Sequence, residues 1–136
     1  MSNADFIAKY CFKQGILKQN GNLLLANGII YSYGSHYPLL FKVNNIPFVN
    51  IAGYSNTTSK HIGIAWRYAK HGVIVPSGRY SSIKTSDVID WLIQESNQLD
   101  LQLLNLKRKG TQKEQRLLSR NTEILEALQA IKNASK

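Results

Sequence analysis

The sequence predicts an α+β fold: a small antiparallel sheet with one amphipathic helix, followed by a C-terminal helical hairpin. Two pairs of short apolar runs are each joined by a turn dipeptide, Asn27-Gly28 and Asn44-Asn45. Composition changes near Ser86, beyond which the chain has a single Gly, no Pro and many Leu, Gln, Glu and Lys residues. We expect a β-rich part over residues 1–86 and a helical part over residues 87–136, packed together as one domain.

The two turn dipeptides predict two hairpins. Leu23–Ala26 and residues 29–33 flank Asn27-Gly28, and such a dipeptide favours a two-residue hairpin because both of its positions need a positive φ. Residues 39–43 and 47–51 form the second pair, in which Pro47 indicates the start of a strand or an edge strand. Residues 4–18 fit a short helix or a strand equally well.

Helical periodicity begins at residue 60. Over residues 60–70 four side chains share one face, and the basic ones lie roughly opposite. Those four are Ile62, Ala65, Trp66 and Ala69. Gly72 is expected to end this helix, and residues 73–75 to form a short strand before Pro76.

Two long helices are expected in the C-terminal part. Thr85 or Ser86 is predicted to cap the first, with Asp87 in its first turn. Its expected buried side chains are Val88, Leu92, Leu99, Leu103 and Leu106. The second helix covers residues 111–134, with Leu117, Ile124 and Ile131 seven apart and Leu118, Leu125 and Leu128 beside them. Residues 107–110 are the expected turn, although one continuous helix also fits; the pair would pack on the sheet or form a homodimer.

Charge is distributed unevenly along the chain, whose formal net charge is +9. Up to Ser86 there are nine basic residues and a single acid, Asp5, whereas from Asp87 onward eight basic residues face seven acidic ones. A positive field without internal counter-charge attracts a phosphate backbone through counterion release. Nucleic acid, DNA or RNA, is therefore the leading partner. An acidic host protein and a basic surface kept for solubility are the alternatives.

The segment from Tyr54 to His61 is a candidate phosphate pocket. Its hydroxyl residues lead into the predicted helix, where free backbone N–H groups and the positive helix dipole would meet Lys60 and His61. An ordinary N-cap run would show the same pattern.

Tyrosines and histidines form two further groups. Tyr31, Tyr33, Ser35 and Tyr37 would alternate onto one face of an extended strand and could stack on unpaired bases, or be half-buried structural tyrosines. The three histidines, His36, His61 and His71, lack the spacing and the nearby carboxylates of a metal site. A metal-independent ribonuclease stays open, since His36, Lys60, His61 and Arg67 could transfer protons and stabilise a phosphorane.

A basic stripe follows the helical turn. It comprises Lys107, Arg108, Lys109, Lys113, Arg116 and Arg120. Four of these share one helical face and could contact phosphates, although solvated charge on a helix explains them as well.

Two strings resemble a known family. Residues 32–39 read S-Y-G-S-H-Y-P-L and residues 54–61 read Y-S-N-T-T-S-K-H. They are similar to the S-Y-G-x-H-x-P-L and Y-S-x-T-T-S-K-H segments of a family of small uncharacterised proteins encoded by bacteriophages and plasmids. The resemblance covers residues 28–70 and implies a mobile-element origin in a bacterial cell, but no activity.

The sequence thus predicts a non-enzymatic nucleic-acid-binding protein without a cofactor or metal. The expected contact residues are Thr57, Thr58, Ser59, Lys60, His61, Arg67, Lys70, Arg79, Tyr33 and His36. A phage-encoded inhibitor of a host defence complex, of the anti-CRISPR kind, is the alternative. The apolar runs are too short for a membrane span, Asp5, Lys9 and Lys13 interrupt any signal-like stretch, and the single Cys11 offers no disulfide, so we expect a cytoplasmic protein.

Overall fold

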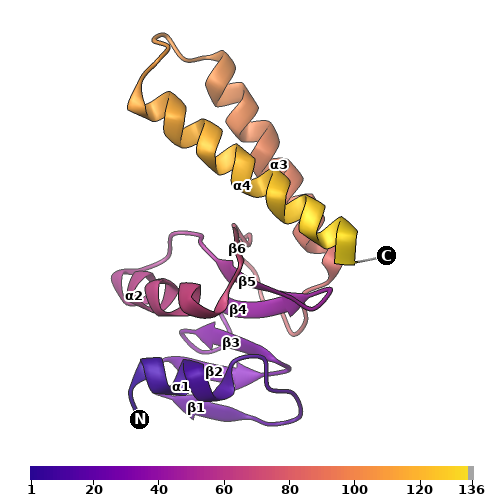
Figure 1. The fold of residues 1–136 in the computed structure, drawn as a ribbon. Helices are drawn as coiled ribbons and strands as arrows, with labels where there is room; N and C mark the ends of the chain where they lie inside the picture. The colour runs from indigo at the N-terminus through magenta and orange to yellow at the C-terminus, as the bar shows by residue number, and fades with distance from the viewer. Residues whose placement is uncertain (135–136) are drawn as a thin grey trace.

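The computed structural model describes residues 1–134 and contains one sheet with helices on both faces (Figure 1). The strands are β1 (Lys18–Asn20), β2 (Leu23–Ala26), β3 (Ile29–Ser32), β4 (Tyr37–Val43), β5 (Ile46–Asn50) and β6 (His71–Val73). The helices are α1 (Asn3–Tyr10), α2 (Asn56–Ala65), a 3₁₀ turn at Trp66–Tyr68, α3 (Thr85–Leu104) and α4 (Gln112–Ala134). The α+β prediction is confirmed, and the undecided N-terminal segment begins with a second short helix.

The strands lie in chain order across the sheet. β1 to β5 form an antiparallel meander, whereas β6 pairs with β5 in parallel after the chain crosses over through α2. Both predicted hairpins are present, and their turn residues have the left-handed φ that the turns require: +54° at Asn27 and +77° at Gly28, then +49° at Asn44 and +64° at Asn45. Local turn chemistry therefore sets the register of β2 against β3 and of β4 against β5.

The sheet has two buried faces. In β3, Ile29 and Tyr31 contact the core beneath α3 and α4, and Ile30 between them contacts the core shared with α1 and α2. A register shift where β3 meets β4 places Leu39 and Leu40 in this second core. Because both faces are covered, these strands are nearly continuous in apolar residues.

The predicted boundaries of α2 are wrong. The helix begins at Asn56, four residues before the expected start, because the Ser55 hydroxyl accepts a hydrogen bond from the Thr58 amide at 3.0 Å. Its buried residues are Thr58, His61 and Ala65, and Trp66 is 41% exposed rather than on the buried face.

The end of the crossover also differs from the prediction. Gly72 lies inside β6 and does not terminate the helix, which tightens into the 3₁₀ turn instead. The strand ends at Val73, two residues before the expected end, because β5 stops at Asn50. From there the Asn50 side chain, not a backbone carbonyl, accepts the hydrogen bond of Val75 N–H at 3.2 Å.

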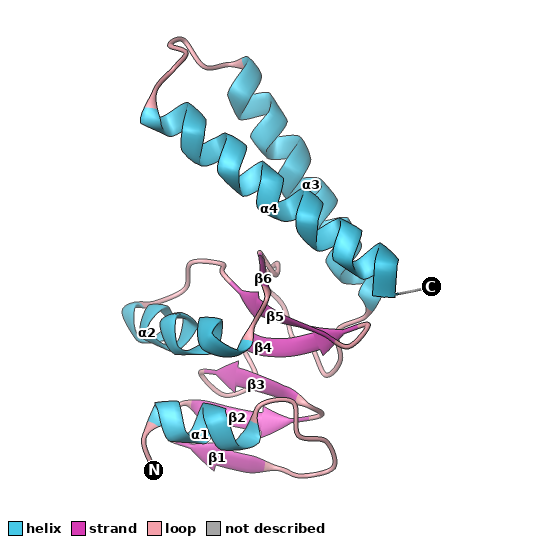
Figure 2. Ribbon diagram, viewed as in Figure 1, coloured by secondary structure: helices cyan, strands magenta, loops and turns pink. Residues whose placement is uncertain are grey.

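α3 and α4 form the predicted antiparallel hairpin, and the turn that joins them lies far from the sheet (Figure 2). Val88, Leu92 and Leu99 are buried as expected, together with Ile124 and Ile131. The predicted cap is off by one residue, since Lys84 is the N-cap and the Asp87 carboxylate accepts its N–H at 3.3 Å. Leu118 and Leu125, expected beside the packed side chains, are 50% and 57% exposed.

An ion pair holds the hairpin against the edge of the sheet. The Arg120 guanidinium donates hydrogen bonds of 2.7 Å to both Glu95 oxygens, and its Nη2 also donates to the Gly72 carbonyl at 3.1 Å. Lys109 donates to the Leu103 carbonyl at the end of α3. The predicted basic stripe therefore loses Arg120, which is only 16% exposed and already paired.

Core packing of the hairpin can be tested on neighbouring turns of α4. We expect Ile124→Ala to lower the free energy of unfolding by about 2–5 kcal/mol, because the side chain is fully buried between the helices and the sheet. Leu118→Ala, at a half-exposed position, is the matched control and should change it by no more than about 0.5 kcal/mol. Urea unfolding measures both, and equal losses would contradict the packing described.

The ion pair gives a second prediction. Arg120→Lys keeps the charge but loses the planar fork that contacts two Glu95 oxygens and Gly72 at once, so we expect a loss of about 2 kcal/mol in unfolding free energy. Arg116→Lys, exposed one turn earlier, should have no measurable effect. Thermal unfolding of the two variants side by side decides the matter, and matching midpoints would contradict a structural role for Arg120.

Candidate nucleic-acid interface

A buried polar network docks α2 on the sheet. His61 Nδ1 lies 2.8 Å from the Ser32 hydroxyl, which lies 3.2 Å from the Thr58 hydroxyl. On its other side, His61 Nε2 lies 3.2 Å from the Asn3 amide nitrogen of α1. Because the Asn3 amide can only donate there, the neutral imidazole carries its proton on Nδ1 and donates it to Ser32.

This network removes two of the predicted contact residues from the surface. Thr58 is fully buried and His61 is 2% exposed, so neither can contact a phosphate outside the protein. Burial lowers the pKa of His61, which fits the neutral ring that the network requires. The proposed quartet of His36, Lys60, His61 and Arg67 therefore lacks the access to substrate that a ribonuclease needs at His61.

A cluster of tyrosine rings lies at the start of α2. The Tyr54 ring lies 5.6 Å from that of Tyr33 and 5.5 Å from that of Tyr37, and it is 56% exposed. The Thr57 hydroxyl, and then that of Ser55, hydrogen bond to the Tyr33 phenol and lower its pKa. Tyr54 thus presents one ring to solvent with two others supporting it.

The predicted alternation of tyrosines along one strand is wrong. β3 ends at Ser32, and Tyr33 (φ +60°) and Gly34 (φ +61°) form a turn before β4. Tyr31 and Tyr37 consequently reach opposite faces of the sheet. The hydroxyl of Tyr37 donates to the carbonyls of Asn50 and Ala52, and burial raises its pKa.

A hollow of about 320 Å³ adjoins the tyrosine cluster. Three segments line it: the β3–β4 turn with the start of β4, the end of β5 with the loop that leads to α2, and the chain that follows β6. Its lining residues are His36, Tyr37, Pro38, Asn50, Ala52, Gly53, Tyr54, Val75, Pro76, Ser77, Gly78 and Arg79. None of these residues carries a carboxylate. The hollow therefore offers hydrogen-bond donors and one cation, Arg79, which suit an anionic ligand.

Asn50 is the buried polar residue of this hollow, at 1% exposure. Its Oδ1 accepts hydrogen bonds from the backbone N–H groups of Ala52 (3.0 Å) and Val75 (3.2 Å), so the oxygen and nitrogen of the amide are assigned without ambiguity. Its Nδ2 has no acceptor among residues 1–134. Since no fully enclosed side-chain nitrogen of the described chain lacks a partner, Nδ2 keeps a small accessible surface, and Asn50 is one of the residues that line this hollow.

Only some predicted residues converge. His36 and Arg79 meet at the hollow, with Tyr33 beside it through Tyr54. Thr57 is at the start of α2, and Ser59 donates to the Ser55 carbonyl within that turn. Lys60 and Arg67 are exposed along the crossover.

The sequence reasoning missed Asn50 and Ser77, which also line the hollow. The signal for Asn50 was a polar residue ending an otherwise apolar run.

Lys70 and His71 lie elsewhere. Lys70 lines a separate hollow of about 190 Å³ with Trp66, His71 and two acids of α4, Glu123 and Glu126. Burial lowers the pKa of His71, against an opposing effect of Glu126. The two carboxylates make this second hollow unsuited to a phosphate, so Lys70 does not belong to the candidate interface.

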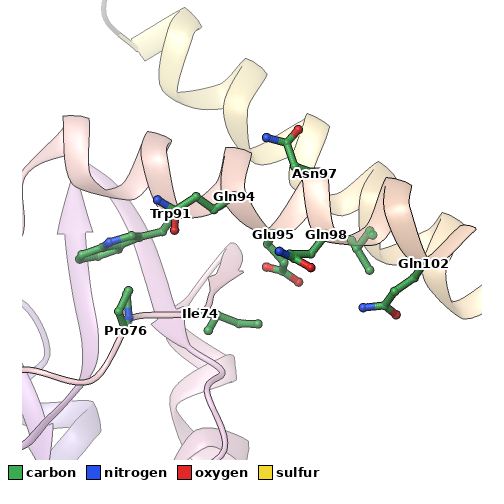
Figure 3. Close-up of a pocket in the computed structure, with 9 residues that line it drawn as sticks. Ile74, Pro76, Trp91, Gln94, Glu95, Asn97, Gln98 and Gln102 are labelled. Atoms are coloured by element: carbon green, nitrogen blue, oxygen red, sulfur yellow. The ribbon is translucent and has the colours of Figure 1, made fainter. Parts of the chain in front are cut away.

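Another cavity, of about 660 Å³, lies between α3 and the chain after β6 (Figure 3). Trp91 and Ile74 supply apolar surface, and the side chains of Gln94, Gln98 and Gln102 follow one side of α3. It holds no Lys, Arg or His, and its one carboxylate, Glu95, is paired with Arg120. This cavity lacks the charge that a polyanion needs.

Among residues 1–134 there is no cluster of His, Cys, Asp and Glu that could hold a metal ion. No helix in that range is both long and apolar enough to cross a bilayer.

Comparison of the chain with family models, with curated proteins and with solved structures finds no match to any of them.

The buried histidine predicts a pH dependence of stability. Burial makes the pKa of His61 lower in the folded state than its ordinary value near 6.5. Just below that pH, therefore, the unfolded chain binds a proton at His61 and the folded chain does not. We expect the free energy of unfolding to be constant above this range and to fall as the pH falls through it. His61→Asn should make that fall shallower.

Urea unfolding from neutral to acidic pH measures the effect. Because His71 would contribute a slope of the same sign, the comparison is made between His71→Asn and the double variant His61→Asn/His71→Asn. Identical slopes in these two variants would contradict a neutral, buried His61.

Proposed function

We propose that the chain is a non-enzymatic nucleic-acid-binding protein of phage or plasmid origin, which holds the phosphate backbone on the basic surface around the hollow. The observation that supports this most directly is the convergence of His36, Tyr54 and Arg79 from three separate segments on a hollow without carboxylates. A cation, Arg79, next to an exposed aromatic ring is the combination that backbone contact and base stacking require.

The state of the basic residues supports the same conclusion. All nine Lys and Arg residues of the β-rich part are exposed. None of the nine forms an ion pair with a described residue, because both ion pairs among residues 1–134 belong to Arg120. Their charge is therefore available to an external polyanion, and release of its counterions would drive binding.

Binding of labelled DNA and RNA across a salt series tests the proposal. We expect binding that weakens steeply with salt, and a logarithmic slope that is shallower by about 1 in Arg79→Gln, since each lost phosphate contact removes about one released counterion. Arg116→Gln removes the same charge on the hairpin, outside the hollow, and should leave the slope almost unchanged.

Two results would contradict the proposal. Absence of binding at low salt would exclude nucleic acid as the partner. RNA cleavage by the purified protein in the presence of a chelator would contradict its non-enzymatic part.

A protein-interaction function, as in an inhibitor of a host defence complex, is the second candidate. It is favoured by apolar side chains that the hairpin leaves exposed: Leu101 (53%), Leu104 (79%), Leu118 (50%) and Leu125 (57%). Leu118 and Leu125 are seven residues apart and so share a face of α4, roughly 140–200° around the helix from Arg120. Arg120 contacts the sheet, so these leucines point away from it. The same surface could join two copies of the chain.

A further inference from the structure

We infer that the hollow at the ends of β5 and β6 binds a single phosphate-bearing nucleotide of an unpaired strand, with the phosphate at Asn50 Nδ2 and Arg79 and the base on Tyr54. This inference rests on the proposed nucleic-acid function and specifies its substrate class: single-stranded rather than double-stranded nucleic acid.

The Asn50 amide is the first argument. A buried polar side chain is almost always satisfied, because an unpaired donor loses about 1–3 kcal/mol when it leaves water. Asn50 is 1% exposed and lines the hollow, its Oδ1 accepts two hydrogen bonds, and its Nδ2 has no acceptor among residues 1–134. A donor held there needs an acceptor from outside the chain. Arg79, lining the same hollow, adds the positive charge that selects an anionic acceptor.

The frame of the hollow is fixed before any ligand arrives. Asn50 Oδ1 links the loop after β5 to the chain after β6. The Tyr80 hydroxyl donates to the Pro76 carbonyl at 2.8 Å, and the Tyr80 carbonyl accepts from the Tyr31 hydroxyl. The Tyr37 hydroxyl, from the start of β4, donates to the carbonyls of Asn50 and Ala52 at the end of β5. A preorganised frame of this kind reduces the entropy lost on binding.

The place of the hollow in the topology is the second argument. β5, α2 and β6 form a parallel β–α–β crossover, and the hollow opens where both strands end. Side chains and backbone N–H groups of the following loops converge at this edge of parallel strands, which is where such units bind phosphate-bearing ligands. The antiparallel remainder of the sheet has no equivalent edge.

The exposed ring of Tyr54 favours a single-stranded over a double-stranded nucleic acid as the ligand. The rings of Tyr33 and Tyr37 both pack against it, with centroids 5.6 and 5.5 Å away, so its exposed ring is a supported surface. A base can cover that surface only when it is unpaired and turned out of its own stack. A regular duplex offers phosphates alone, and a hollow of about 320 Å³ takes only a small part of a chain at a time.

The test uses Asn50→Asp. The carboxylate still accepts from the amides of Ala52 and Val75, and those two hydrogen bonds keep it ionised, but the donor in the hollow becomes a negative oxygen. Asn45→Asp is the matched control: it changes the net charge equally, at the exposed turn at the other end of β5. Anisotropy with a labelled single strand and with its duplex, at fixed salt, gives the affinities of wild type and both variants.

We expect wild type to bind the single strand more tightly than the duplex, Asn50→Asp to lose about tenfold or more on the single strand, and Asn45→Asp to lose no more than about twofold. Tyr54→Leu, at an exposed position, gives a second measurement if Asn50→Asp unfolds: it should weaken single-strand binding until the preference for the single strand is lost.

The two ways of failing are distinct. Salt-dependent binding that is equal for the two strand types, and equal in Asn50→Asp and Asn45→Asp, would overturn the role of the hollow and leave the proposed function standing. Absence of binding to either strand type in wild type would overturn both.

Discussion

The arrangement of this molecule depends on one buried contact between the sheet and the helix that covers it, from Ser32 at the end of β3 to His61 in the middle of α2. This contact, with Thr58 and Asn3 on either side, fixes the crossover helix over the strands of the meander. Because α2 is held there, β6 returns parallel to β5 and the loops at the ends of these strands lie next to the β3–β4 turn. The position of the candidate site therefore follows from a polar contact that has no part in binding.

The parts of the fold that local chemistry dictates could be predicted from the sequence. Asn27-Gly28 and Asn44-Asn45 require a positive φ, so both hairpins and the strands beside them follow from the residues at the turns. The helical hairpin follows in the same way from apolar periodicity and Gly110. The buried side of α2 and the end of β6 could not be predicted, because they depend on contacts between distant residues: Thr58 and His61 with Ser32, and Val75 with Asn50.

The same distinction applies to the candidate site. Residue type and charge identified His36, Arg79 and the tyrosines, but a linear pattern does not show that a turn, a loop and the chain after a strand meet at one hollow. It also assigned His61 to the surface, since a hydroxyl-rich helix start looks the same whether its side chains face solvent or a neighbouring strand. Asn50 was missed because the two polar atoms of its amide differ in role: Oδ1 accepts two structural hydrogen bonds, and Nδ2 has no partner in the described chain. Only the hydrogen-bond partners distinguish the two atoms.

The contact of Arg120 with Gly72 has a further consequence, for self-association. β6 is an edge strand, and the open hydrogen-bonding groups of such an edge can recruit a strand from another molecule. Here a guanidinium occupies one of those groups and the helical hairpin lies against the strand. At the opposite edge β1 is three residues long and begins with a lysine. Both edges of the sheet are thus protected against strand-to-strand polymerisation: the helical hairpin covers β6, and β1 is short and carries a charged residue.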